Sequence, residues 1–276
     1  MRLALCNEVV KQYDFAQQCE FAAALGYEGL EVAPMTLSEE PHRLPANERQ
    51  RLRRAAADAG IAIASLHWLL VKPPGLSITR GDAAVRARTL EVMRGLVELA
   101  ADLGAKIMVH GSPAQRRLPE GPEAVSARGR GLDAFRSMVE RAERLGIVYC
   151  IEPLSRDQTN FITSLAEAAQ IVRDFASPAI RTMIDCSSAG RGERESVAAL
   201  IDRWLPTGLV AHVQANDRNR RGPGQGEDRF APILAALRRN RYAGWIAVEP
   251  FDYVPDGPAA AARAAGYLRG IMEAQA

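Results

Sequence analysis

Eight short apolar runs alternate with eight longer helical stretches along the whole chain. The apolar runs cover 3–9, 29–34, 61–70, 106–111, 147–154, 181–187, 209–216 and 245–251. The stretches between them, 14–25, 47–59, 82–104, 122–145, 164–176, 193–204, 228–240 and 258–274, space their apolar residues three or four apart, as on one face of a helix. Eight strand–helix units in 276 residues predict an α/β fold, a single (β/α)8 TIM barrel spanning 1–276.

Glycine-containing turns join four of the helical stretches to the next apolar run. They read ALGYEGLEV, DAGIAIA, DLGAKIMV and RLGIVYCI. Glycine at such a place adopts the left-handed conformation that ends a helix. The alternative fold is a doubly wound open sheet, but no GxGxxG loop follows the first apolar run. The Pro- and Gly-bearing stretches 72–81, 112–122 and 217–227 each follow an apolar run, so we expect them on the catalytic face of the barrel.

The composition argues against several classes of partner. Lys and Arg number 35 against 33 Asp and Glu, a formal net charge of +2, which does not indicate a nucleic-acid-binding surface. No stretch approaches the roughly 20 apolar residues of a membrane-spanning helix. The four cysteines have no CxxC spacing, which is typical of a reducing compartment. We therefore expect a cytoplasmic protein without nucleic-acid or membrane partners, with homo-oligomerisation left open.

Polar side chains stand near the ends of the apolar runs, where a barrel collects its catalytic groups. Glu152, Asp185 and Glu249 lie in the runs at 147–154, 181–187 and 245–251. A buried carboxylate is costly unless it is paired or bound to a metal ion. His212 and Gln214 lie two residues apart, so on a strand they face the same side and either could join the carboxylates. Such a donor set suits one divalent ion, Mg²⁺, Mn²⁺ or Co²⁺.

Two roles are possible for each of several polar residues. The carboxylates could hydrogen-bond one another across the barrel mouth without an ion. Glu31 could hydrogen-bond into the site or pair with an arginine at the mouth. His67 in SLHWLL and His110 in VHGSP could contact the site or act as satisfied polar caps. His42 lies among prolines in a loop, where we expect it to be solvated.

Aromatic and basic residues mark a possible ligand pocket. Trp68 and Phe251 could form the walls of a sugar pocket or pack in the core. The arginines at 218, 220 and 221 precede GPGQG and follow the run at 209–216. At least one of them, facing a hydroxyl-rich or anionic ligand, would be well placed for recognition.

Longer motifs extend the pattern beyond single residues. The stretch HVQANDRNRRGPGQGEDRFAPILAALRRNRYAGWIAVEPF covers 212–251, IEPLSR surrounds Glu152, and TMIDCSS surrounds Asp185. With LHWLL and VHGSP, these motifs give a sequence that resembles the xylose-isomerase-like barrels over nearly its whole length. Within them it resembles the ketose 3-epimerase and hydroxypyruvate isomerase branch. The resemblance implies a divalent-metal-dependent isomerase or epimerase that acts on a sugar or keto-polyol by proton transfer through an enediolate.

The resemblance also implies roles for particular residues. The metal ligands would be Glu152, Asp185, Gln214 and Glu249, with Glu152 and Glu249 also exchanging the proton. The third ligand is His in the epimerases and Gln in the hydroxypyruvate isomerases, so Gln214 resembles the latter. His212 then precedes the ligand and is either an alternative ligand or a residue behind it.

The expected substrate-binding residues are His67, His110, Gln158, Ser188 and Arg220. Two of them, Gln158 and Ser188, depart from the epimerases. Gln158 stands where the epimerases have a glutamate, and Ser188 stands where they have a histidine. Both changes remove groups that hold the hydroxyls of a ketose, so the resemblance does not extend to a particular small-molecule carbohydrate.

Three other functions are possible on the same barrel. A metal-dependent lyase or dehydratase would use the same carboxylates for β-elimination, and the sequence does not decide between elimination, isomerisation and epimerisation. A non-catalytic sugar-binding barrel would not need both Glu152 and Glu249. A DNA-repair endonuclease would need a histidine-rich cluster of three zinc ions, and this chain has four histidines in all.

Overall fold

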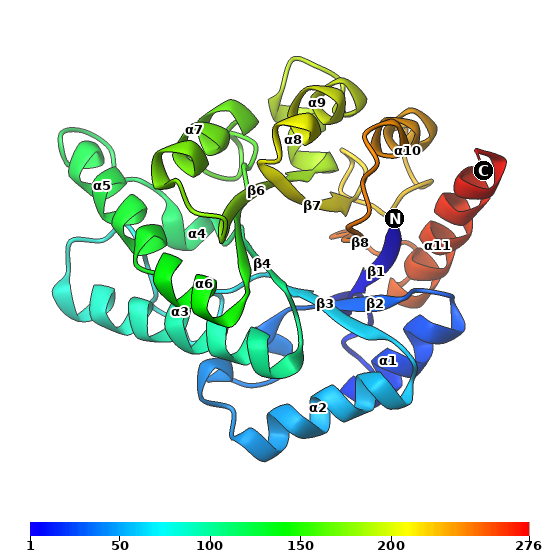
Figure 1. The fold of residues 1–276 in the computed structure, drawn as a ribbon, viewed down its shortest axis with the longest axis horizontal. Helices are drawn as coiled ribbons and strands as arrows, with labels where there is room; N and C mark the ends of the chain where they lie inside the picture. The colour runs from blue at the N-terminus through cyan, green and yellow to red at the C-terminus, as the bar shows by residue number, and fades with distance from the viewer. Residues whose placement is uncertain (276) are drawn as a thin grey trace.

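The computed structural model describes residues 1–275, in which helices surround a central ring of strands (Figure 1). The strands are β1 Arg2–Cys6, β2 Gly29–Val32, β3 Ala62–Leu66, β4 Ile107–His110, β5 Val148–Ile151, β6 Ile180–Asp185, β7 Val210–Ala215 and β8 Trp245–Val248. Within residues 1–275 they form a closed parallel barrel in sequence order, and β8 pairs with β1. The predicted (β/α)8 barrel is confirmed. Residue 276, the expected end of the domain, lies outside the described residues.

The helices pack around the outside of the barrel (Figure 1). They are α1 Phe15–Ala24, α2 Ala46–Asp58, α3 Ala83–Leu103, α4 Pro113–Arg116, α5 Glu123–Arg136, α6 Val139–Leu145, α7 Leu165–Phe175, α8 Cys186–Gly192, α9 Val197–Trp204, α10 Phe230–Arg239 and α11 Gly257–Ala274. Short 3₁₀ turns are η1 Asn7–Val10, η2 Pro34–Thr36, η3 Pro41–Arg43 and η4 Leu205–Thr207. None of the helices in residues 1–275 combines the length and apolar character needed to cross a membrane.

Local sequence signals explain several element boundaries. Gly104 and Gly146 end α3 and α6 with φ of 84° and 64°, the left-handed conformation expected of these turns. The helical stretch expected at 122–145 divides into α5 and α6. At the division, the Ser137 hydroxyl donates to the carbonyl of Ala134 across 2.8 Å and so competes with the helical hydrogen bonds.

The barrel interior has an apolar plug with a polar layer above it. The plug consists of Ile107, Val109, Cys150 and Met183. Further along the strands, Glu31 pairs in register with both Cys6 and Ser65, and Asp185 pairs with Gln214. Paired residues on neighbouring strands point to the same side of a sheet. The polar layer therefore lies at the carboxyl ends of the strands, where barrels build their sites.

His42 does not have the solvated position expected from the sequence, and that expectation was wrong. It is buried in η3 and packs against α3 at Gly95. A Cβ at residue 95 would come within 2.9 Å of the His42 backbone oxygen. The absence of a side chain there allows the loop to lie directly on the helix, which a local pattern around His42 does not reveal.

Candidate metal and substrate site

The four expected metal ligands come from consecutive strands at one end of the barrel. Glu152 follows β5, Asp185 ends β6, Gln214 lies in β7 and Glu249 follows β8. Their exposed fractions are 7%, 3%, 1% and 4%, in that order. Four polar side chains are thus withdrawn from water at the point where the strands converge.

The three carboxylates affect one another electrostatically. Burial raises the pKa of Glu152 well above its ordinary value, and repulsion from Asp185 and Glu249 raises it further. Burial likewise raises the pKa of Glu249, and repulsion from Asp185 acts in the same direction, although His67 opposes both. Gathering buried negative charges is unfavourable unless protons or a cation neutralise them. A divalent cation bound by oxygen atoms fits this requirement.

Gln214 offers an oxygen atom that fits such an ion. Its Nε2 donates a hydrogen bond to Oε1 of Glu31 across 2.6 Å. Its Oε1 is buried and has no hydrogen-bond partner among residues 1–275. Buried polar atoms are rarely left unpaired, so this amide oxygen, on the strand between those that carry Asp185 and Glu249, is suited to be a metal ligand. Among residues 1–275, however, the carboxylate oxygens of Glu152, Asp185 and Glu249 do not all lie within 4.8 Å of one another.

Glu31 has the first of its two predicted roles, since it hydrogen-bonds into the site. Its Oε2 accepts from the hydroxyl of Ser65 and lies 2.7 Å from Nε2 of His212, at ion-pair distance but without hydrogen-bond alignment. Burial alone would raise the pKa of Glu31, but the charges of His212 and His67 and the hydrogen bonds hold it well below its ordinary value. An ionised Glu31 therefore orients the Gln214 amide from behind, and His212 lies with Glu31 rather than with the carboxylates.

Asp185 is held in place by one backbone donor and one side-chain donor. Its Oδ1 accepts from the backbone N–H of Ser188 across 2.6 Å, which caps the start of α8. Its Oδ2 accepts from Nδ2 of Asn216, also across 2.6 Å. The same amide group donates to the backbone oxygen of Glu249 across 3.1 Å. A carboxylate has more acceptor positions than these bonds use, so Asp185 is oriented and still able to bind a cation.

Glu152 lies over a glycine and next to a buried arginine. A Cβ at Gly111 would collide with the Glu152 carboxylate, so the position of this side chain depends on the glycine. Arg116 is fully buried and donates to the backbone oxygen of Glu152 across 2.7 Å. Sequence patterns gave no reason to single out either residue, because their contacts with Glu152 form only in the folded barrel.

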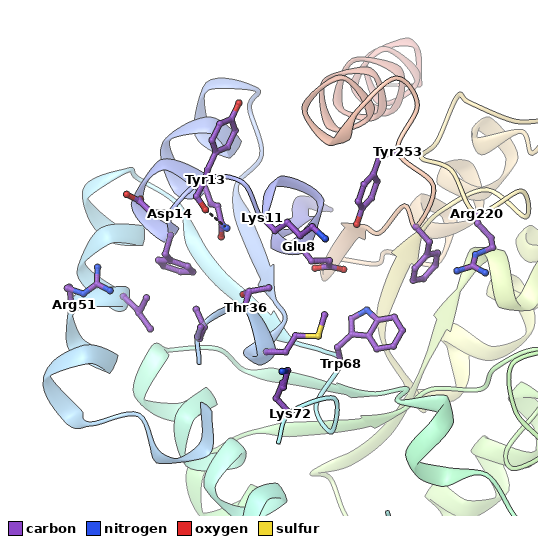
Figure 2. Close-up of a pocket in the computed structure, with 16 residues that line it drawn as sticks. Glu8, Lys11, Tyr13, Asp14, Thr36, Arg51, Trp68, Lys72, Arg220 and Tyr253 are labelled. Carbon is purple, nitrogen blue, oxygen red and sulfur yellow. Dashed lines mark hydrogen bonds between the residues drawn. The ribbon is translucent and has the colours of Figure 1, made fainter. Parts of the chain in front are cut away.

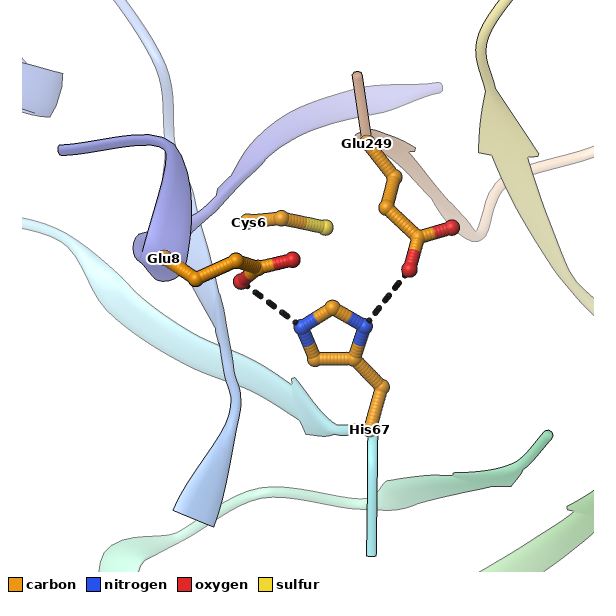
Figure 3. A group of neighbouring side chains, drawn as sticks. All are labelled: Cys6, Glu8, His67 and Glu249. Atoms are coloured by element: carbon orange, nitrogen blue, oxygen red, sulfur yellow. Dashed lines mark hydrogen bonds and ion pairs between the residues drawn. The ribbon is translucent and has the colours of Figure 1, made fainter. Parts of the chain in front are cut away.

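A second group of potential ligands shares Glu249. Ligand atoms of Cys6, Glu8, His67 and Glu249 lie within 4.8 Å of one another and form a possible buried metal-binding group (Figure 3). The imidazole of His67 lies 3.0 Å from Oε1 of Glu249 and 3.0 Å from Oε2 of Glu8, one carboxylate at each ring nitrogen. Burial raises the pKa of the Cys6 thiol, which disfavours the thiolate that metals bind.

Each candidate group contains one buried oxygen without a hydrogen-bond partner among residues 1–275, Oε1 of Gln214 in the first and Oε1 of Glu8 in the second. In the second group both ring nitrogens of His67 already have carboxylate partners, Glu249 and Glu8. His67 is thus engaged in holding these two carboxylates. Sequence reasoning missed Glu8, although its place near the end of the first apolar run matches that of the other polar residues.

A small cavity brings several of the predicted residues together. It has a volume of about 20 Å³, room for a single water-sized group. Its lining includes His67, Gly111, Glu152, Gln158 and Glu249. Trp68 and Phe251 also line it, with their rings packed edge to face.

His110 is not part of this cavity. Val109 and Cys150 face the barrel interior and pair in register, so His110, one residue further along β4, faces the helices. Its Nδ1 lies 2.6 Å from the hydroxyl of Tyr149, and its ring packs edge to face against Phe135. Burial and Arg116 lower the pKa of His110 to about 3. This position supports a structural role and not contact with a substrate.

The two departures from the epimerases lie in contact with each other. Oε1 of Gln158 accepts from the hydroxyl of Ser188 across 2.9 Å. It also accepts from the backbone N–H and the hydroxyl of Ser155, across 3.2 Å and 2.7 Å. Because these donors occupy its oxygen, Gln158 can offer only N–H donors to a molecule in the cavity.

A larger cleft of about 710 Å³ opens beside the small cavity (Figure 2). Trp68 and Phe251 line both spaces, which makes them walls of the pocket rather than core residues. Arg220 also lines the cleft and has a φ of 71°, with its guanidinium 5.2 Å from the centre of the Phe251 ring. The predicted residues therefore divide between a cavity that holds the carboxylates and a wide approach to it.

Known proteins match this chain along most of its length. D-psicose 3-epimerase of Agrobacterium fabrum is 29% identical over 247 residues, which cover 86% of this chain and 79% of that protein. The 3-dehydro-D-guloside 4-epimerase of Escherichia coli is 23% identical over 259 residues, covering 90% of this chain and 92% of that protein. A solved structure of D-psicose 3-epimerase in the presence of D-fructose has a TM-score of 0.80 at 21% identity. It covers 98% of this chain and 99% of that one, and it has the same fold.

These matches confirm the class of activity expected from the sequence, because the curated relatives are sugar epimerases. The xylose isomerase-like TIM barrel family itself matches residues 19–271, from within α1 to within α11. The chain belongs to the xylose isomerase-like TIM barrel family.

Proposed function

We propose that this protein is a divalent-metal-dependent sugar epimerase or isomerase that moves a proton at the carbon next to a carbonyl. The observation that carries the proposal is that Glu152 and Glu249 line one cavity, while Oε1 of Gln214 is buried without a hydrogen-bond partner among residues 1–275. Burial raises the pKa of both carboxyl groups, to about 8 for Glu249, so each holds a proton more readily than an exposed carboxyl group does. The substrate is a small carbohydrate. Location in the cytoplasm and homo-oligomerisation stay predictions.

Two carboxyl groups at one cavity can take opposite parts in a single proton transfer. One accepts the proton from the carbon next to the carbonyl, and the other donates a proton to the same carbon or to its neighbour. Return to the same carbon from the opposite side gives an epimer, and return to the neighbouring carbon gives an isomer. His67 holds Oε1 of Glu249 at 3.0 Å, which restricts the orientation of this group.

The remaining residues orient the substrate and limit the access of water. The Gln158 amide can donate to a substrate oxygen, because its own oxygen is already bonded to Ser155 and Ser188. The aromatic rings of Trp68 and Phe251 separate the small cavity from the wide cleft. Excluding bulk water strengthens electrostatic interactions in the cavity and keeps a transferred proton from exchanging early.

The ion would be held by Glu152, Asp185 and Glu249 together with Oε1 of Gln214. When bound, a divalent cation would polarise a carbonyl oxygen of the substrate and stabilise the negative charge that grows as the proton leaves. A set of oxygen donors is typical of Mg²⁺ and Mn²⁺ sites, and Co²⁺ is a further candidate.

Deuterium incorporation tests the proposed proton transfer. A ketose such as D-fructose, incubated in D₂O with Mn²⁺-loaded protein, is expected to gain deuterium at the carbon next to its carbonyl. Exchange should require the ion and should be lost in Glu249→Gln, which keeps the shape of the side chain but removes the base. Asp252→Asn, at an exposed carboxylate nearby in sequence, is the matched control and should retain exchange.

The mass of the product distinguishes the alternatives. Epimerisation and isomerisation change the mass only by the label, whereas elimination releases water or a larger group. Product formed without any deuterium, at a rate with no solvent isotope effect, would indicate a hydride shift between carbons. That result would contradict the roles given to Glu152 and Glu249.

A further inference from the structure

The cavity and the cleft are far from equal in size. The cavity at Glu152 and Glu249 has about 20 Å³, whereas the cleft beside it has about 710 Å³. Clefts of roughly 300–1,000 Å³ are typical of ligands larger than a single sugar ring. A free monosaccharide with its reacting carbons at the carboxylates would leave most of this cleft to water.

The cleft adjoins the cavity that contains Glu152 and Glu249. Oxygen atoms of Glu8 and Glu249 lie within 4.8 Å of each other, and Glu8 lines the cleft while Glu249 lines the cavity. Trp68 belongs to both linings. A molecule bound over Glu249 therefore reaches the cleft past the Trp68 and Phe251 rings, which line both spaces.

The polar groups of the cleft are unsatisfied in the way that a hydroxyl-rich ligand requires. Oε1 of Glu8 is buried and has no hydrogen-bond partner among the described residues. Such an atom calls for a donor, which a sugar hydroxyl supplies. Lys11 and Arg220 also line the cleft, and neither side chain has an ion-pair or hydrogen-bond partner within residues 1–275. Both can donate to sugar oxygens.

Aromatic side chains supply the other half of a sugar-binding surface. In the view of Figure 2, Tyr253 points toward Glu8 from above, and the Trp68 ring lies below Glu8. The apolar faces of sugar rings pack against aromatic rings, while their hydroxyl groups reach polar atoms at the ring edges. An aromatic wall beside an unpaired acceptor and two unpaired donors matches a second sugar ring better than a lipid or an apolar group.

We propose that the substrate is a keto-sugar that carries a second glycosyl unit, with its reacting carbons at Glu152 and Glu249 and the second ring in the cleft against Trp68. The inference rests on the proposed function. It adds that binding energy comes from the part of the molecule that does not react.

Isomaltulose and D-fructose form a matched pair of probes. Both contain the same ketose, and isomaltulose carries a glucosyl unit at the far end from the carbonyl. The chain has three tryptophans, and only Trp68 lines the cleft, whereas Trp204 lies in α9 and Trp245 begins β8. Binding in the cleft should therefore change the fluorescence of Trp68, measured by titration in the Glu152→Gln variant to prevent turnover.

We expect isomaltulose to bind at least about tenfold more tightly than D-fructose. Trp68→Phe should abolish the fluorescence change, and calorimetry should show that it also removes the advantage of isomaltulose. Trp204→Phe is the control and should leave both unchanged. Lys11→Ala, at an exposed position, should weaken the binding of isomaltulose more than the binding of D-fructose.

Equal or tighter binding of D-fructose would overturn the inference, and so would the absence of any Trp68 response up to the solubility limit of isomaltulose. The deuterium experiment separates this failure from failure of the proposed function. Exchange into D-fructose without binding of isomaltulose would leave the proposed function intact and refute the second ring. Tight binding of isomaltulose without exchange into either sugar would support the site for a second ring and refute the proposed function.

Discussion

Nε2 of Gln214 donates to Oε1 of Glu31 across 2.6 Å, and this single bond determines which end of the Gln214 amide faces the carboxylates. The oxygen is left buried and unpaired within the described residues. Were the amide reversed, an N–H group would take the place of this oxygen and could not bind a cation. Glu31 thus prepares the site for an ion without contacting it.

Replacing Glu31 tests this orientation. Glutamine offers one acceptor oxygen in place of two, so Ser65 and Gln214 would compete for it in Glu31→Gln. We expect Mn²⁺ affinity to fall by about 10- to 100-fold, as for other residues that orient metal ligands. Calorimetric titration of protein stripped with a chelator measures the effect. Glu28→Gln, at an exposed carboxylate, is the control, and an unchanged affinity in Glu31→Gln would refute the orienting role.

The expected ligand set predicts about one divalent ion per chain after refilling with Mn²⁺. Glu152→Gln, Asp185→Asn and Glu249→Gln should each weaken binding, because each removes a charged oxygen donor. Elemental analysis after dialysis gives the stoichiometry. A full complement of metal in the triple variant would show that the ion binds elsewhere.

Two further pairs of variants locate the ion more closely. Gln214→Ala should lose metal affinity, whereas His212→Ala should keep most of it, because His212 lies against Glu31 instead. Cys6→Ser should also keep it, although Cys6 belongs to the neighbouring group around His67. Metal lost in Cys6→Ser and retained in Gln214→Ala would place the ion in that other group.

Replacing Gly111 tests whether the Glu152 carboxylate needs the space that this glycine leaves open. In Gly111→Ala the new methyl group would collide with the Glu152 carboxylate and displace it. Metal binding and deuterium exchange should both fall at least about tenfold, while thermal unfolding still shows a folded protein. Gly129→Ala is the matched control, because a Cβ there meets nothing within 4 Å in the middle of α5. It should leave binding unchanged and stabilise the helix by roughly 0.5–1 kcal/mol.

Stability of the chelator-stripped protein should fall as the pH rises. Burial raises the pKa of Glu249 from 4.5 to about 8, so between these values the folded state holds a proton that the unfolded state has released. The free energy of unfolding should then decrease by about 1.4 kcal/mol per pH unit from this group. Urea unfolding between pH 5 and 8 measures the slope, and excess Mn²⁺ should remove or reverse it, because metal binds the ionised carboxylates. Stability that rises with pH in the stripped protein would contradict the assigned pKa shift.

Local patterns in the sequence were enough to predict the architecture. Apolar periodicity distinguishes strands from helices, and glycines such as Gly104 and Gly146 mark helix ends through conformations that need no distant partner. The order of strands follows from the barrel rule, so the placement of Glu152 and Glu249 at the same end could also be predicted. These inferences depend only on neighbours along the chain and on one general rule of topology.

Tertiary structure alone decided how these side chains meet. His110 and Glu152 both stand near strand ends, but the phase of each strand turns His110 toward the helices and Glu152 toward the cavity. The contact between Gln158 and Ser188 and the bridge from Glu8 through His67 to Glu249 join residues that are distant in sequence. Such contacts depend on strand register, on the bulge between Thr182 and Met183, and on closure of the barrel. The sequence therefore determined which groups reach the end of the barrel, and only closure in three dimensions decided their partners.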